Sequence, residues 1–335
     1  MNTLVEDIID FLRSNGFECE LLDRMGQEVI FVRCGGEVSS AVRCIVPQEV
    51  CAESMCEAKE QAEQLRLLLN SLEEDNLEAI VITEDRWRNQ GNMMRARLLA
   101  HLERFASLYA RNCKVQKIDK ETAAAFLGQN HSYGDAACRY RYGLYLKRCT
   151  GKKAEISLAG AQATSSMTRL ALLARNDSGD GILVAVATFS NARKWQKGDK
   201  RIRSYEWTRY ASLPGVRISG GMGKVLKAFI KDVQPDDIMS YADLEWSEGK
   251  VYEQLGFVLE GKKDPVMFSV DGQWHRSALK QQSGLCMTVV DMPPTARGCR
   301  SGAKTGVNES HAQTTDRFFQ NLGSNKYRLK LTPYE

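Results

Sequence analysis

The chain has 335 residues, of which 43% are hydrophobic and 26% charged, and its formal net charge is +4. These fractions are ordinary for globular proteins, and no apolar run approaches the roughly 20 residues that a membrane span requires. The N-terminal stretch MNTLVEDIID lacks the basic start and the cleavage site of a signal peptide. We therefore expect a cytoplasmic protein, and its length favours two domains.

The N-terminal third is predicted to contain the elements α-β-β-β-α-β. An apolar stripe at helical spacing stops at Asn15 and Gly16, which predicts a first helix. Short β-branched runs separated by glycine turns predict strands. These strands span 17–22, 28–34, 38–46 and, after a second helix over 55–72, 77–83.

A basic amphipathic helix is predicted next, near residues 93–108. Its arginines lie off the apolar stripe that includes Met94 and Leu98, so we expect them to be available to solvent or to a partner. A short strand over 112–118 and a helix over 119–130 follow. His131 at the end of that helix is expected to be a hydrogen-bonded loop histidine.

The second half is predicted to alternate strands with polar loops and helices. The expected strands span 139–147, 168–176, 182–190, 203–211, 237–243, 257–260 and 326–331. Helices are expected over 225–233 and 249–255, and polar loops over 150–166 and 191–202. The segment 293–316, rich in Pro, Gly, Ser and Thr, is expected to be a flexible loop.

The ten cysteines show no spacing typical of a metal site or a redox motif. Several of them, such as Cys34 and Cys44, lie in apolar runs that resemble strands. We therefore expect buried, reduced thiols, with a metal site as the alternative.

Charge is distributed unevenly along the chain. Residues 49–85 contain eleven acids and two bases, whereas residues 86–153 contain fifteen bases and four acids. Such asymmetry indicates an anionic partner, and bases interleaved with tyrosines can bind nucleic acid. The alternative is a solvated surface that the acidic stretch neutralises, with the tyrosines in the core. The candidate nucleic-acid contacts are Arg95, Arg97, Arg139, Arg141, Lys147, Arg148, Lys152 and Lys153.

A glycine-rich turn enters an amphipathic helix in RISGGMGKVLKAF, residues 217–229. Glycines let the main chain approach a ligand, and a helix N-terminus offers free amides and a positive dipole end to a pyrophosphate. The alternative is a turn that only caps the helix. The candidate cofactor-binding residues are Arg217, Ser219, Gly220, Gly221, Met222, Gly223 and Lys224.

The run VYEQLGF, residues 251–257, resembles the segment that closes the CoA site of GNAT proteins, the acyl-CoA-dependent N-acetyltransferases. The resemblance implies that acetyl-CoA binds at the glycine turn, that Tyr252 protonates the CoA thiolate and that Glu206 is the general base. One departure is that Ile218 occupies the Q/R position of the family's glycine loop. The alternatives are that Tyr252 packs against the sheet and that Glu206 pairs with Arg203 or Arg209.

Residues 112–331 are similar to a GNAT-like module of phage and mobile-element proteins. The likeness rests on YGLY at 142–145, YADLEWS at 241–247, VYEQLGF and NLG at 321–323. In that family the preceding part often resembles a PD-(D/E)XK or very-short-patch-repair endonuclease, with which the predicted order α-β-β-β-α-β agrees. The third strand has no carboxylate, however, and the E-x-K pair needed beside Mg²⁺ is missing.

We therefore expect an α+β protein of two domains. Residues 1–110 are expected to form a degenerate restriction-endonuclease-like α/β domain without a metal site, and residues 112–335 a GNAT-like acyltransferase domain with a mixed sheet. The leading function is an acetyl-CoA-dependent N-acetyltransferase-like protein associated with DNA or a mobile element. The alternatives are a non-catalytic nucleic-acid-binding protein that keeps the GNAT fold and a divergent metal-dependent endonuclease.

Overall fold

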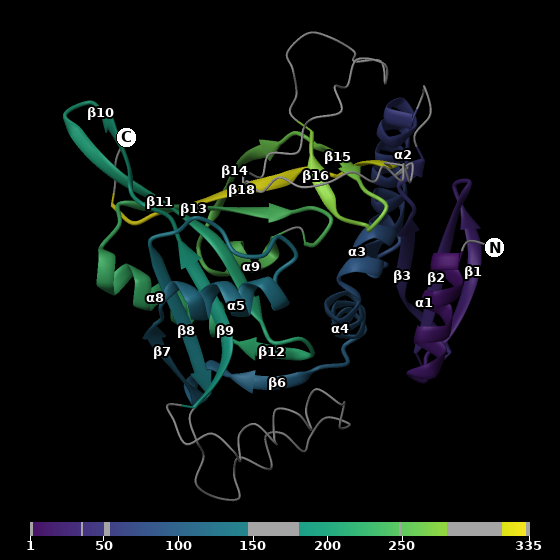
Figure 1. The fold of residues 1–335 in the computed structure, drawn as a ribbon, viewed down its shortest axis with the longest axis horizontal. Coiled ribbons are helices and arrows are strands. Elements are labelled where there is room, and N and C mark those ends of the chain that lie inside the picture. The colour runs from purple at the N-terminus through teal and green to yellow at the C-terminus, as the bar shows by residue number, and fades with distance from the viewer. Residues whose placement is uncertain are drawn as a thin grey trace, which may run out of the picture.

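The computed structural model describes residues 3–34, 36–49, 54–146, 181–247, 249–279 and 317–332. Over these residues the chain is an α+β protein with several mixed sheets (Figure 1), so the α+β part of the expected fold class is confirmed. The strand predicted at 168–176 and the loops predicted at 150–166 and 293–316 lie outside the described residues.

The N-terminal elements follow the predicted order. They are α1 (Thr3–Ser14), β1 (Glu18–Arg24), β2 (Gln27–Cys34), β3 (Glu37–Ile45), α2 (Ser54–Glu74) and β5 (Ala79–Thr83). The strands form one sheet in the order β1-β2-β3-β5, in which β3 and β5 are parallel and the other pairs antiparallel. Leu4, Ile8 and Leu12 of α1 are fully buried against this sheet, because their spacing places them on one face of the helix.

The basic helix predicted near 93–108 is shorter than expected. The structure has α3 (Glu84–Asn89), α4 (Gly91–His101) and then the strand β6 (Ala106–Tyr109). Helix α4 ends because Glu103 adopts a left-handed conformation, with φ 58°. The amide of Arg104 then donates to the carbonyl of Leu99 at 2.7 Å, the bond that closes a Schellman C-cap.

A large sheet contains most of the strands that the structure describes beyond residue 112. Its strands, in the order β14-β18-β13-β11-β9-β8-β7, are β14 (Val258–Lys263), β18 (Ser324–Lys330), β13 (Asp237–Asp243), β11 (Lys200–Ser212), β9 (Ile182–Phe189), β8 (Tyr140–Leu146) and β7 (Cys113–Lys117). The 3-10 turn η1 (Ala110–Asn112) precedes β7, and the helices of this part are α5 (Lys120–Asn130), α8 (Gly221–Val233) and α9 (Lys250–Gln254).

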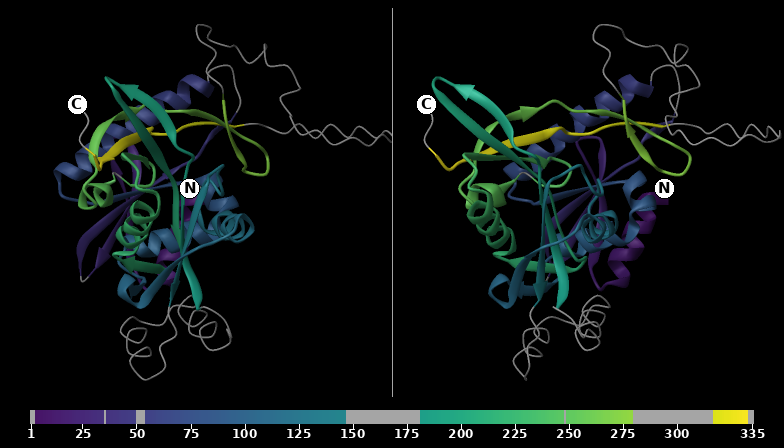
Figure 2. Two further views of the ribbon diagram at one scale, coloured as in Figure 1. Left: turned by 90° about the vertical axis from the view of Figure 1, so that its left-hand side faces the viewer. Right: turned by 60° about the vertical axis from the view of Figure 1, so that its left-hand side comes forward.

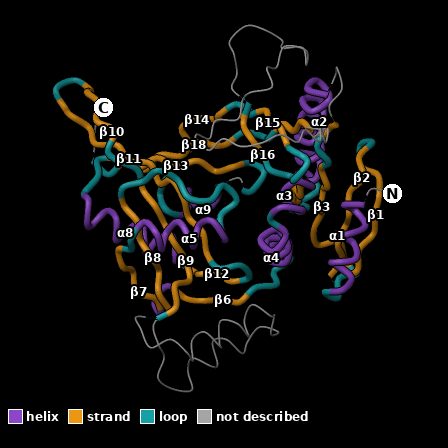
Figure 3. Tube along the Cα trace, in the orientation of Figure 1, coloured by secondary structure: helices purple, strands orange, loops and turns teal. Residues whose placement is uncertain are grey.

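Helices α5 and α8 cover opposite faces of this sheet (Figure 3). Phe229 of α8 stacks on Phe189 of β9 with ring centroids 3.9 Å apart. Leu127 of α5 belongs to a separate cluster with Val186 of the same strand. Residues three apart on a strand point to opposite faces, so β9 is buried on both sides, which explains its continuous apolar run.

The loop predicted at 191–202 is in fact a two-stranded ribbon. β10 (Arg193–Lys197) pairs antiparallel with the beginning of β11, from Lys200 to Ser204. Most of its side chains are exposed on both faces, so the segment lacks the apolar alternation by which strands are predicted. The ribbon projects from the body of the molecule in all views (Figures 1 and 2).

Two smaller sheets join segments that lie on either side of the expected boundary at 110–112. β6 pairs in parallel with β12 (Val216–Ser219). A second sheet has the order β16-β15-β17-β4 and consists of β16 (Arg276–Ala278), β15 (Met267–Val270), β17 (Arg317–Gln320) and β4 (Gln48–Glu49). Phe319 of β17 shares a buried cluster with Leu65 of α2, so the two halves share sheets and core.

Candidate functional site

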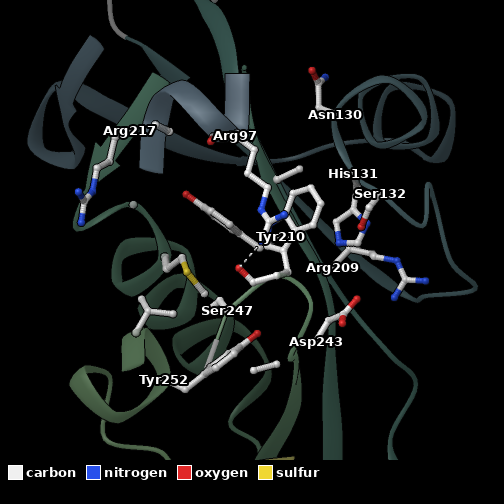
Figure 4. A pocket seen from close by; sticks show the side chains of 18 of the residues that line it. Arg97, Asn130, His131, Ser132, Arg209, Tyr210, Arg217, Asp243, Ser247 and Tyr252 are labelled. Atoms are coloured by element: carbon white, nitrogen blue, oxygen red, sulfur yellow. Dashed lines mark hydrogen bonds between the residues drawn. The ribbon is translucent and has the colours of Figure 1, made fainter. Parts of the chain in front are cut away.

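A cleft opens where β11 and β13 separate. Main-chain pairing between these parallel strands is confined to Ser204–Glu206 on β11 and Asp237–Met239 on β13. Beyond that point lies a cavity of about 930 Å³, lined by β11, β13, the N-terminus of α8, α9, α4 and the segment 130–133 (Figure 4). The predicted strand, glycine turn, helix, strand, helix and strand over 203–260 are all present, but the additional strand β12 (Val216–Ser219) precedes the glycine turn.

The glycine turn forms one wall of this cleft. Gly220 caps α8 in the left-handed conformation, with φ 74°, and Gly221, Met222 and Gly223 line the cavity. A Cβ atom on Gly221 would lie 2.8 Å from the Tyr210 hydroxyl, so a side chain there is sterically excluded. The first amides of a helix have no acceptor within the helix and carry its positive dipole end, and here they border the cleft.

Three other predicted cofactor residues differ in position. Arg217 lines the cleft, with its guanidinium 5.2 Å from the ring centre of Phe105. Ser219 is exposed on β12. Lys224 instead donates its Nζ to the carbonyls of Ala110 at 2.8 Å and Cys113 at 2.7 Å. Lys224 therefore fastens α8 to the η1 turn, which contradicts its predicted direct role in binding.

Tyr252 of α9 lies at the floor of the cleft (Figure 4). Its hydroxyl is 2.9 Å from Oγ of Ser240, and its ring stacks on Tyr327 with centroids 5.3 Å apart. Burial raises the pKa of Tyr252, so the phenol keeps its proton at neutral pH. The residue thus packs against the sheet and also lines the cavity.

Glu206 stands on β11 at the last residue that pairs with β13, and it lines the cleft. Its nearest ion-pair partner is Arg193 of β10, with 3.7 Å between Nη2 and Oε2. The expected partners were Arg203 and Arg209, but Arg203 pairs with Asp236 at 3.5 Å. The Glu206 side chain is 22% exposed.

The opposite end of the cleft contains groups that sequence reasoning did not assign to the site. Figure 4 shows His131 and Arg209 across the cleft from Arg217, with Asp243 nearby. Nδ1 of His131 accepts from the amide of Tyr133 at 3.1 Å, as expected for a loop histidine. Burial, with Arg209 and Arg86, lowers the pKa of His131 to about 4, so this imidazole is neutral at physiological pH. No single sequence motif links these positions, because they come together only in the fold.

A buried network of charges lies behind this end of the cleft. Arg276 forms two hydrogen bonds with the carboxylate of Asp85, at 2.7 and 3.0 Å, and one with Glu245 at 2.9 Å. Arg86 is 3.1 Å from Glu245 and 3.5 Å from Asp243. We call Asp85, Arg86, Glu245 and Arg276 the junction cluster, because it joins α3 to β16 and to the end of β13.

The structure contradicts the prediction that Arg97 contacts nucleic acid. Its guanidinium donates to the carbonyls of Val81 at 2.9 Å and Glu245 at 2.6 Å and stacks over Trp246 at 4.3 Å. Burial lowers the pKa of Arg97 to about 9. The helical pattern placed Arg97 off the apolar stripe of α4, but that face is covered by residues 245–246, which lie far away in the sequence.

The other predicted nucleic-acid residues are more accessible or lie elsewhere. Arg95 is exposed, with its guanidinium 4.8 Å from the ring centre of Trp87. Arg139 is exposed beside Tyr140, whereas Arg141 is partly buried and donates to the carbonyl of Cys138 at 2.9 Å. The remaining four, Lys147, Arg148, Lys152 and Lys153, lie outside the described residues.

Within the described ranges, no group of three or more His, Cys, Asp or Glu residues is arranged to hold a metal ion. Cys44 and Cys113 are buried as expected, whereas Cys56 on α2 is exposed. None of the helices in the described part of the chain has the length and apolar character required to span a membrane.

Comparisons with known proteins give no family for this chain. No protein-family model matches the sequence, and a search of curated proteins finds no match. The function must therefore be argued from the cleft and from the surface.

Proposed function

We propose that the cleft binds an acyl-CoA thioester and that the protein transfers its acyl group to an amine. The observation that carries this proposal is the meeting of three features in one cavity: the parting of β11 and β13 after Glu206, the glycine-bounded N-terminus of α8, and the buried hydroxyl of Tyr252. A helix N-terminus can bind an anionic group of the ligand, and the phenol can protonate a departing thiolate.

The amides of Gly221, Met222 and Gly223 are the expected partners of the ligand's pyrophosphate. Amides at a helix N-terminus bind phosphate through hydrogen bonds and the helix dipole. The absence of a side chain at Gly221 lets the main chain of the turn pack closely against Tyr210 and Ile218, which holds these amides in place. Arg217 at the rim adds a cation for the phosphates.

Glu206 and Tyr252 are the expected acid–base pair. The amine nitrogen attacks the thioester carbonyl carbon while the Glu206 carboxylate takes one proton from it. The carbon–sulfur bond then breaks, and Tyr252 gives its proton to the departing thiolate. Because burial raises the pKa of Tyr252, the phenol is protonated at neutral pH and can serve as the acid.

Calorimetric titration of the full chain with acetyl-CoA tests the binding step. We expect saturable binding, and we expect Gly221→Ala to weaken it about tenfold or more, since hydrogen bonds to charged groups contribute about 1.5–3 kcal/mol. Gly261→Ala is the matched control, because a Cβ there meets nothing within 4 Å. Absence of binding to the folded wild type would overturn the proposal.

A second experiment tests the chemistry. Free thiol release from acetyl-CoA is measured with a lysine-rich peptide as the amine source. Tyr252→Phe should lower the turnover about 10²–10⁴-fold with little change in acetyl-CoA affinity, because general acid catalysis contributes on that order. Equal turnover in the variant would remove Tyr252 from the reaction.

A further inference from the structure

The ribbon formed by β10 and the beginning of β11 is the most basic projecting element that the structure describes. Between residues 193 and 203 it contains six bases and one acid. Lys194, Lys200 and Arg201 are exposed, and Trp195 is 36% exposed. The ribbon extends away from the body of the molecule (Figures 1 and 2). We call residues 193–203 the basic ribbon.

The strand register places like charges opposite one another. Lys194 is paired with Arg203. Directly opposed residues of an antiparallel pair lie on the same face, and like charges at such positions are destabilising. Two acids near the base of the ribbon pair with it over long distances, Asp236 with Arg203 at 3.5 Å and Glu206 with Arg193 at 3.7 Å. Lys194 and Arg201, which lie farther along the ribbon, are exposed and can contact an anion outside the chain.

We propose that the basic ribbon docks into the major groove of duplex DNA. The major groove of B-form DNA, about 12 Å wide, admits a two-stranded β-ribbon. Bases along both strands of such a ribbon then reach phosphates on both groove edges. The deep, narrow major groove of A-form RNA does not admit it.

The composition of the ribbon also argues against a lipid surface as the partner. Peripheral membrane binding requires a buried apolar face in addition to basic residues. Trp195 is the one large apolar side chain between residues 193 and 203 that is exposed, since Ile202 is 3% exposed. The basic ribbon therefore exposes charge and little apolar area. Binding to a polyanion depends mainly on charge, so a polyanion is the partner that fits it.

Fluorescence anisotropy with a labelled duplex of about 20 base pairs tests the proposal. The full chain is titrated at several salt concentrations from about 50 to 200 mM, the range over which phosphate contacts weaken steeply. The double variant Lys194→Ala/Arg201→Ala should reduce the slope of log affinity against log salt by about 1.8, at about 0.9 per lost phosphate contact. Its affinity at the lowest salt should fall at least about tenfold.

The matched control is Lys227→Ala/Lys231→Ala, which removes the same charge from two exposed positions on α8. We expect this control to change the affinity less than about threefold. An equal loss in the control and the ribbon variant would show general electrostatic attraction and overturn the proposal. So would a wild type that does not bind at about 50 mM salt.

Three further probes separate the possible polyanions. Single-stranded DNA, duplex RNA of the same sequence, and vesicles that contain phosphatidylserine are each titrated with the wild type. Binding to any of them that equals or exceeds binding to duplex DNA would overturn groove docking. Gly221→Ala should leave DNA affinity unchanged, so failure of the acyl-CoA proposal and failure of this one are distinguishable.

Discussion

The junction cluster and the basic ribbon contain the same kinds of cation in opposite environments. Arg86 and Arg276 have side chains 5% and 9% exposed, and each is held by carboxylates from distant segments. Lys194 and Arg201 point into solvent. In the sequence, Arg86 begins the base-rich stretch 86–153, and the basic ribbon has six bases and one acid. The difference teaches that a basic stretch predicts an anionic partner only where the fold leaves its charges in water.

The environment decides what each cation can do. A buried ion requires partners because its desolvation costs several kcal/mol. Burial is the largest single influence and lowers the pKa of Arg86, but Glu245, Tyr133 and Asp243 together outweigh it and raise the pKa. The same guanidinium group in the ribbon is hydrated and can exchange water for phosphate. Four predictions test this contrast, from the largest expected effect to the smallest.

The largest effect is expected from Arg276→Ala. This change removes the cation that bonds Asp85 and leaves Glu245 with Arg86 alone, and both carboxylates are nearly fully buried. Breaking a buried ion pair from one side typically costs about 3–5 kcal/mol. Urea unfolding should show that loss of stability, and Arg201→Ala is the surface control. A loss below about 1 kcal/mol would show that the cluster is solvated.

The second prediction concerns pH. His131 has a folded pKa of about 4, below its ordinary value of 6.5. The unfolded chain therefore binds more protons between these values, and the free energy of unfolding falls as pH drops from about 6.5 to about 4. The loss is on the order of 3 kcal/mol, and it is absent above about pH 7.

The matched variant for this test is His131→Asn, which keeps a hydrogen-bond acceptor for the Tyr133 amide. The difference in unfolding free energy between wild type and variant should shrink as pH falls. His101 also has a pKa lowered by burial, but it is present in both proteins, so its contribution cancels. Parallel pH curves for the two proteins would contradict a neutral, buried His131.

The third prediction concerns Arg97, which composition alone would place in a nucleic-acid surface. Arg97→Ala should destabilise the fold by about 2–3 kcal/mol, because buried carbonyls lose their donor. The folded fraction should bind duplex DNA as the wild type does. A drop in DNA affinity without a drop in the free energy of unfolding would mean that Arg97 contacts DNA. The distinction between buried cations and the exposed cations of the basic ribbon would then be wrong.

Sequence patterns predicted those parts of the fold that depend on neighbours in the chain. The order α1 to β5 and the series β11, α8, β13, α9 follow from apolar periodicity and glycine turns, and both were found apart from the short strands β4 and β12, which were not predicted. The end of α4 was missed because it depends on the left-handed conformation of Glu103. A glutamate in the sequence does not indicate that conformation. β10 was missed because a strand exposed on both faces has no apolar alternation.

The residues of the candidate site likewise divide into those that local motifs predicted and those that only tertiary packing brings to the cleft. Gly221, Glu206 and Tyr252 belong to local motifs, and all three line one cleft. Lys224 was assigned a direct role because it follows the glycines, but its ammonium group bonds to main-chain carbonyls of Ala110 and Cys113. His131 comes from a segment whose proximity to the cleft arises from tertiary packing alone.

The smallest effect on stability is expected where the largest effect on DNA affinity is expected. Lys194→Ala/Arg201→Ala should change the free energy of unfolding by less than about 0.5 kcal/mol, as surface substitutions usually do. Removal of Lys194 also relieves its repulsion from Arg203, its partner in the strand register, so the change should be zero or slightly stabilising. Urea unfolding measures this value on the same protein used for anisotropy. If the double variant instead loses more than about 1 kcal/mol, these bases stabilise the ribbon itself, and their loss could not be separated from loss of the docking element.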